Sequence, residues 1–253
     1  MKPWHKLNST KRFITVLMVF AACLAVTWQA GGATAYQKPP KAVLDILRAP
    51  DAPSVSVSPA GDQILLTDTD RYPSIADMAQ PMARLAGLRI NPTTNGPHGT
   101  RRITGFSLIK VADGSSRKVD LPASGPILAS GGTSWSADGK FIALTHTTAN
   151  AVELWIIDTA AARMRKIPGI TLNAAYGQGV QWMPDQRSLL VQAIPAGRGK
   201  APAPPPVPSG PNIQENIGKE APVWTYQDLL ETPYDEDLFD YLSTSQLGTV
   251  DVA

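Results

Sequence analysis

Cysteine is almost absent from this sequence, which has a single one, Cys23, among 253 residues. Cys23 lies in the N-terminal apolar stretch, so the chain beyond it can form no internal disulfide and must be stabilised by packing. Charged residues are also scarce, at 17% against 43% hydrophobic residues, which excludes a disordered chain. Turn formers are abundant instead. With 23 prolines and 20 glycines, the composition favours many short strands over a helical bundle.

Histidine is nearly as rare, and a serine nucleophile motif is missing. Of the three histidines, His5 lies in the N-terminal segment, and His98 and His146 have no second ligand at a metal-binding spacing. The pentapeptide Gly-x-Ser-x-Gly of α/β-hydrolases does not occur. Its nearest approach, Gly105-Phe106-Ser107, has the context of a strand. The sequence therefore predicts no catalytic residue and no metal site.

Other polar stretches have simple structural interpretations. The glycines at 125–132 and 197–200 lack the order of a phosphate-binding loop and are interpreted as connections, so no cofactor is expected. The carboxylates Asp235–Asp237 are most simply those of a helix start, where they complement the helix dipole, and weak cation binding is the alternative. Trp135 and Trp182 are predicted to be core residues and not a ligand-stacking pair.

The first 35 residues have the three parts of a secretory signal. Basic residues precede an apolar stretch from Phe13 to Trp28, and the small residues Ala33-Thr34-Ala35 follow as a cleavage site. The stretch has about 16 residues, fewer than the roughly 20 of a membrane-spanning helix. We predict a signal peptide over 1–35 cleaved after Ala35, a secreted or periplasmic product, and no stable membrane insertion. A retained anchor and a lipoprotein modified at Cys23 are the weaker alternatives.

Removal of this segment changes the charge balance. Four of the 23 basic residues lie in it, so 19 remain against 21 acidic residues, a formal charge of about −2. The apparent basicity of the whole chain belongs to the signal. No nucleic-acid partner is therefore expected.

A turn motif recurs along the remaining chain, twice clearly and once in degraded form. The copies read Val-Ser-Pro-Ala-Gly-Asp from Val57, Trp-Ser-Ala-Asp-Gly-Lys from Trp135 and Trp-Met-Pro-Asp-Gln-Arg from Trp182. Each precedes an apolar run, and the glycines provide the positive φ of a tight hairpin. The last two copies begin 47 residues apart, close to the length of a four-stranded propeller blade. The first two begin 78 apart, which indicates an extra unit or a large insertion.

The unit that begins near Trp135 is the most complete. Strands are expected at 132–135, 141–147, 151–158 and 163–167, which make one antiparallel blade. Other strands are predicted at 64–66, 103–111, 116–121, 179–182, 188–194 and 246–252, and helices at 42–47, after Ser74, near Thr225–Asp228 and after Thr232. The predicted fold class is all-β: a partial (incomplete) β-propeller of four-stranded antiparallel blades with short helical insertions. It occupies 36–253, is interrupted by a proline-rich insertion at 195–211, and ends in an unfinished blade.

Several stretches together carry a family resemblance. The motif at 135–144 resembles the blades of the prolyl oligopeptidase family and of TolB-type propellers. The more specific stretches, at 82–90, 210–216, 225–230, 235–241 and 244–247, are similar to the N-terminal region of glutamyl endopeptidases in that family. The similarity extends, with gaps, over most of residues 38–252.

The resemblance implies a whole enzyme that cleaves peptides after glutamate. In such enzymes the propeller restricts access to a C-terminal α/β-hydrolase domain with a serine, aspartate and histidine triad. This chain departs from that pattern because no hydrolase domain is recognised in it, so no triad residue is assigned and activity of this chain alone is not expected. A glutamate pocket needs a basic group, for which the candidates are Arg71, Arg84, Arg89, Arg101 and Arg102.

Three functional hypotheses follow. The first is a non-catalytic propeller part of a secreted serine endopeptidase, which meets its peptide substrate through a hydrolase domain outside this chain. The second is a free-standing TolB-like periplasmic propeller that acts as a binding module. The third is an independent enzyme of unknown type. The few visible blades and the open end favour the first.

Overall fold

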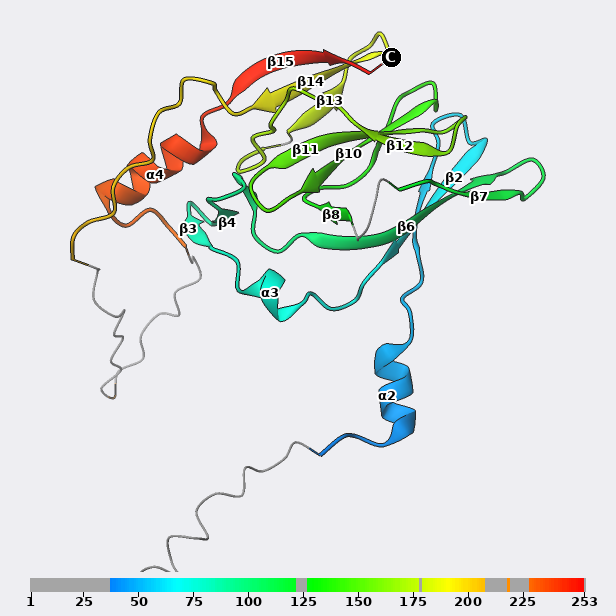
Figure 1. Cartoon of the computed structure of the whole chain (residues 1–253), viewed down its shortest axis with the longest axis horizontal. Coiled ribbons are helices and arrows are strands. Elements are labelled where there is room, and N and C mark those ends of the chain that lie inside the picture. Colours follow the sequence, from blue (N-terminus) through cyan, green and yellow to red (C-terminus); the bar gives the residue numbers. More distant parts are fainter. Residues whose placement is uncertain (1–36, 122–126, 178, 208–217, 219–227, 253) are drawn as a thin grey trace, which may run out of the picture. The chain divides into compact units, whose positions relative to one another are not determined.

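The computed structural model describes residues 37–121, 127–177, 179–207, 218 and 228–252 (Figure 1). The chain divides into two units, 1–49 and 50–253. In the first, the predicted helix is present as α2 (Lys41–Arg48), with Lys41 and Asp45 paired across one turn. The predicted signal peptide lies outside the described residues. None of the helices that the structure describes has the length and hydrophobicity of a membrane-spanning segment.

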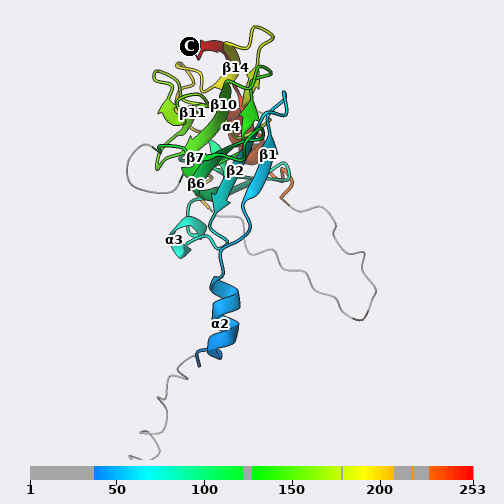
Figure 2. The ribbon, with the colours of Figure 1, turned by 90° about the vertical axis from the view of Figure 1, so that its right-hand side faces the viewer.

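The first sheet of the second unit is antiparallel and has five strands. Four of them follow one another across the sheet, with β1 at its edge, and the fifth pairs with the beginning of β6 (Figure 2). They are β1 (Ser54–Val57), β2 (Gln63–Thr69), β6 (Arg101–Lys110), β7 (Ser116–Lys118) and β8 (Ile127–Ala129). The first motif copy forms the β1–β2 turn, where Gly61 has a φ of +74°. The predicted hairpin is confirmed.

An insertion separates β2 from β6. It contains a short helix and a small antiparallel sheet: α3 (Ile75–Met78), β3 (Ala83–Leu85), β4 (Leu88–Asn91) and β5 (Gly96–Pro97). The helix begins at the predicted Ser74, in a reciprocal capping box with Asp77. The segment 70–100 has 31 residues, the difference between the two motif spacings of 78 and 47. The wider spacing therefore comes from an insertion within the first sheet and not from an extra repeat.

The second sheet is the unit predicted to be most complete, and it has the expected four strands in the expected order. They are β9 (Ser134–Trp135), β10 (Phe141–Thr147), β11 (Val152–Asp158) and β12 (Arg163–Lys166). Gly139, at the tip of the second motif copy, has a φ of +72°. In the third copy Gln186 takes this position with a φ of +57°, although it has a side chain.

The third sheet is also split by an insertion. Its strands are β13 (Val180–Trp182), β14 (Ser188–Ala193) and β15 (Gln246–Asp251), and all pairs are antiparallel. Between β14 and β15 lie the proline-rich segment and α4 (Pro233–Ser243), which begins in a capping box at Thr232 as predicted. Residues 195–207 contain no strand, and 208–211 lie outside the described residues. So does most of the helix start predicted at Thr225–Asp228.

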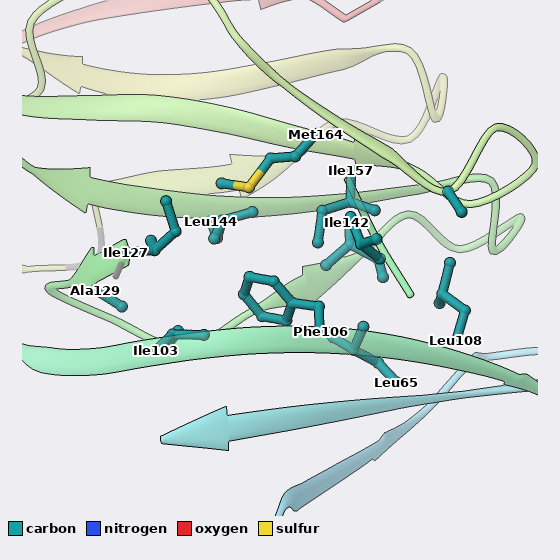
Figure 3. Close-up of a cluster of buried hydrophobic side chains, with 12 residues drawn as sticks. Leu65, Ile103, Phe106, Leu108, Ile127, Ala129, Ile142, Leu144, Ile157 and Met164 are labelled. Carbon is teal, nitrogen blue, oxygen red and sulfur yellow. The ribbon is translucent and has the colours of Figure 1, made fainter. Parts of the chain in front are cut away.

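The three sheets pack face to face around two apolar cores. Phe106 and Leu65 of the first sheet meet Ile142 and Ile157 of the second (Figure 3). The opposite face of the second sheet, with Leu154, packs on the third. Because side chains alternate along a strand, Ile156 and Ile157 enter different cores, which explains the nearly continuous apolar run of β11.

A third apolar cluster joins the two insertions. Leu85 and Ile90 of the small sheet pack with Leu242 of α4 and with Ala175, which precedes β13.

No described sheet closes on itself. The fold is therefore all-β, an open part of a β-propeller with short helical insertions, as predicted.

Candidate functional site

An arginine-lined cleft lies where β2 ends and β6 begins. It has a volume of about 590 Å³ and is bordered by three of the five basic candidates, Arg71, Arg101 and Arg102. Asp51, Asp70, Gly99 and Thr100 are among the other residues that line it. The insertion within the first sheet provides part of the lining, because residues 70–100 leave the sheet and return to it here.

Carboxylates already engage two of these arginines. The Arg71 guanidinium donates to Asp51, and this hydrogen bond holds the pKa of Asp51 below its ordinary value. Arg102 donates to Asp77 at 3.0 Å and to Asp70 at 3.3 Å. The pKa of Asp77 is also lowered, chiefly by the Ser74 hydroxyl that donates to it and further by Arg102.

Arg101 differs from its neighbours. Its side chain is exposed, and no ion pair joins it to any of the residues that the structure describes. An incoming anion at Arg101 would therefore displace no protein carboxylate. A guanidinium of this kind presents several donors that match a carboxylate.

The other two arginine candidates lie away from the cleft. Arg84 of β3 and Arg89 of β4 face each other across the small sheet, and both pair with Asp228, at 3.8 and 3.5 Å. Asp228 is largely buried, and its carbonyl accepts from the Gly87 amide at 2.7 Å. These two arginines thus tie the small sheet to the segment that precedes α4.

Neither described histidine is placed for nucleophilic or metal chemistry. His98 Nε2 lies 3.2 Å from the Gln80 carbonyl, and His146 Nδ1 accepts from the Leu128 amide at 3.1 Å. Burial against Trp155 is accompanied by a lowered pKa of His146, which favours the neutral imidazole. No cluster of three metal-ligating side chains occurs among the described residues.

The remaining sequence candidates have structural places. Ser107 lies within β6, between Leu66 and Lys118 of the neighbouring strands. Asp235 lies in the capping box at the start of α4, so the prediction of a helix start at these carboxylates is confirmed. The two tryptophans pack at the sheet interfaces, Trp135 in the first core and Trp182 in the second.

Sequence reasoning missed a buried polar network that links the two insertions. Asn95 and Asn173, 1% and 0% exposed, are hydrogen-bonded to each other, and both donate to the Leu242 carbonyl at 2.9 Å. Arg198 of the proline-rich segment donates to Asn95 and stacks over the Tyr241 ring, 4.1 Å from its centroid. Isolated asparagines carry no sequence signal for such a network, because its members come from four separate segments.

Two curated proteins are similar to most of this chain. A probable chloroplastic glutamyl endopeptidase of Oryza sativa subsp. japonica is 37% identical over 226 residues, which cover 84% of this chain and 24% of that protein. A protein of the same description from Arabidopsis thaliana is 35% identical over 227 residues, covering 85% and 23%. The chain therefore spans about a quarter of the length of these relatives.

Solved structures resemble the chain more distantly, and no family model matches it. The acylaminoacyl peptidase of Pyrococcus horikoshii is 16% identical, with 58% of this chain and 18% of that chain covered and a TM-score of 0.34. The β-propeller domain of the Trilobed protease of Pyrococcus furiosus is 16% identical, with coverages of 57% and 36% and a TM-score of 0.32. The resemblance indicated by the motifs is thus confirmed at the level of sequence: over most of its length, this chain is a relative of proteins described as probable glutamyl endopeptidases.

Proposed function

We propose that this chain is the propeller part of a secreted serine endopeptidase resembling glutamyl endopeptidase, and that it gates peptide access to an α/β-hydrolase domain outside this chain. The observation that carries the proposal is the 37% identity over 84% of the chain, confined to 24% of the relative. The antiparallel sheets and their insertions span residues 54–251, so a match over 84% of the chain includes most of them.

The cleft supports a role for Arg101 in recognising an acidic peptide. Four of the five basic candidates are paired with carboxylates, and Arg101 is the one with no ion pair among the described residues. A glutamate carboxylate at the cleft would gain charge-assisted hydrogen bonds there. We therefore assign to Arg101 the contact with an acidic side chain of the peptide as it passes the propeller.

Secretion remains part of the proposal through the predicted signal at 1–35. The relatives from Oryza sativa and Arabidopsis thaliana are described as chloroplastic, which is a statement about those proteins. The alternative is a free-standing binding propeller. The sequence match to probable glutamyl endopeptidases favours the endopeptidase proposal over it.

Peptide hydrolysis tests the proposal directly. Residues 36–253 and the product of any reading frame that continues past the Ala253 codon are purified and assayed with fluorogenic peptides that contain glutamate or glutamine at the same position. We expect the longer product to cleave after glutamate and residues 36–253 to cleave neither peptide. Peptide hydrolysis by residues 36–253 that persists after a second purification would contradict the non-catalytic role.

A further inference from the structure

Strand β8 is held between the first and second sheets by two kinds of hydrogen bond. On one edge it pairs with the beginning of β6, where Leu128 lies opposite Arg102. On the other edge two backbone amides donate to side chains of β10. Leu128 donates to His146 Nδ1 at 3.1 Å, and Ser130, which follows β8, donates to Thr145 Oγ1 at 3.3 Å. We call these two side-chain acceptors the β8 latch.

The bond from Leu128 requires a neutral imidazole. A backbone amide can only donate a hydrogen bond, so Nδ1 of His146 accepts with its lone pair and the ring proton lies on Nε2. An imidazolium carries a hydrogen on both ring nitrogens and cannot accept. Protonation of His146 therefore removes one of the two bonds of the β8 latch. The bond to Thr145 persists, because a threonine hydroxyl gains no proton in this pH range.

The charged groups around His146 give an imidazolium little compensation. Glu153 of β11 lies opposite His146. Its carboxylate already accepts from Lys166 of β12 at 2.6 Å and from the Trp155 indole at 3.1 Å. Arg102, the charged residue of β6 beside the latch, donates to two carboxylates of the insertion. Burial lowers the pKa of His146 and outweighs the opposite effect of Glu153.

The β8 latch is connected to the arginine-lined cleft through the pairing of β8 with β6. Ala129 of β8 lies opposite Arg101, which lines the cleft. The pairing of β6 with β2 extends over residues 103–110, and its pairing with β7 extends over residues 107–109. Among the described strands, β8 alone therefore pairs with Arg101. The position of the Arg101 backbone at the cleft thus depends on β8.

We infer that the β8 latch is a pH-sensitive switch: protonation of His146 releases the Leu128 amide, loosens β8 from β10 and frees the end of β6 that carries Arg101. Ile127 and Ala129 of β8 are 3% and 4% exposed and stay in the first core (Figure 3). The change is therefore a local opening of one strand edge and not an unfolding of the sheet. The inference depends on contacts between described residues and does not rest on the proposed endopeptidase function.

Amide hydrogen exchange of the purified chain, measured for single residues by NMR at about pH 7.5 and about pH 5, tests the inference. Protection factors are compared, because they are corrected for the intrinsic pH dependence of exchange. We expect the protection factor of Leu128 to fall about tenfold at the lower pH, the effect of losing one hydrogen bond, and that of Arg101 to fall with it. The protection factor of Ser130 should fall less, because Thr145 remains its acceptor.

Two substitutions separate titration from packing. H146Q keeps an acceptor that does not titrate, so the protection factor of Leu128 should be the same at both pH values. H146F keeps a ring without an acceptor, so this protection factor should be low at both. H98Q is the matched control, because His98 is the other described histidine and contacts the Gln80 carbonyl. It should behave as the wild type does.

The wild-type measurement alone decides the inference if a variant does not fold. A protection factor of Leu128 that is equal at the two pH values in the wild type would overturn it. So would a fall that persists in H146Q, or one that H98Q abolishes. A fall at Leu128 without a fall at Arg101 would overturn the connection to the cleft.

Discussion

The buried amide of Asn173 gives the most direct test of how the insertions are held to the sheets. Its Nδ2 donates to the carbonyls of Leu242 and Thr244, both at 2.9 Å. Its Oδ1 accepts from Asn95 Nδ2 and from the Ala175 amide. One side chain therefore joins the segment before β13 to the end of α4 and to the insertion of the first sheet.

The expected cost of N173A follows from the partners that it leaves. The Leu242 carbonyl keeps Asn95 as a donor, whereas the Thr244 carbonyl and the Ala175 amide lose their bonds to Asn173. Each polar group left unsatisfied away from water costs about 1–3 kcal/mol. The Ala175 amide is buried whereas Thr244 is exposed to water, so we expect N173A to lower the free energy of unfolding by about 1–3 kcal/mol.

Urea titration at fixed protein concentration measures this change through the midpoint and the slope of the transition. N150A is the matched control, since Asn150 is exposed in the β10–β11 turn, and a change within about 0.5 kcal/mol is expected there. N173D keeps the two accepted bonds but places a buried carboxylate oxygen against the Leu242 and Thr244 carbonyls, so at neutral pH it should cost at least as much as N173A. A cost for N173A no larger than that for N150A would refute the reasoning.

Two further predictions concern charge. Under the proposed function, R101Q in the longer product should raise KM for a glutamate-containing peptide about tenfold, the effect of losing ~1.4 kcal/mol of charge-assisted hydrogen bonding, and leave KM for the glutamine peptide unchanged. R163Q, which replaces an exposed arginine of the second sheet, is the control. An equal effect of R101Q on both peptides would argue against the assignment. Burial lowers the pKa of His146 below its ordinary 6.5, so its contribution to stability is complete above that pH and decreases as the pH falls through 6.5 toward the folded-state pKa. Unfolding of H146Q between pH 7.5 and 5 should therefore depend less on pH than unfolding of the wild type, and parallel pH profiles would contradict this account.

The strands and turns of the second sheet were predictable from the sequence because each depends on neighbouring residues. The Asp-Gly pair at the tip of the motif that begins at Trp135 provides the positive φ of the turn. Alternating or continuous apolar runs flank this turn and indicate strands. The capping boxes at Ser74 and Thr232 are equally local, since each joins residues three apart. The family resemblance was also available, because several motifs lie in a fixed order.

Partners distant in the sequence could not be predicted in this way. Sequence spacing allowed an extra repeat or an insertion before Trp135, and the pairing of β2 with β6 across residues 70–100 decided for an insertion. Among five candidate arginines, nothing in the sequence distinguished Arg101. The structure does, because Asp51, Asp70, Asp77 and Asp228 pair with the other four.

By itself, then, the sequence determined the elements whose causes are local: the turns, the caps, the alternation of the strands and the family they indicate. Only the tertiary structure decided at which strand the chain rejoins a sheet after an insertion, which charged side chains form ion pairs and which apolar faces of the sheets are covered. The physical reason is that hydrogen-bond pairing and burial depend on distances between segments, and these distances are set only when the chain has folded.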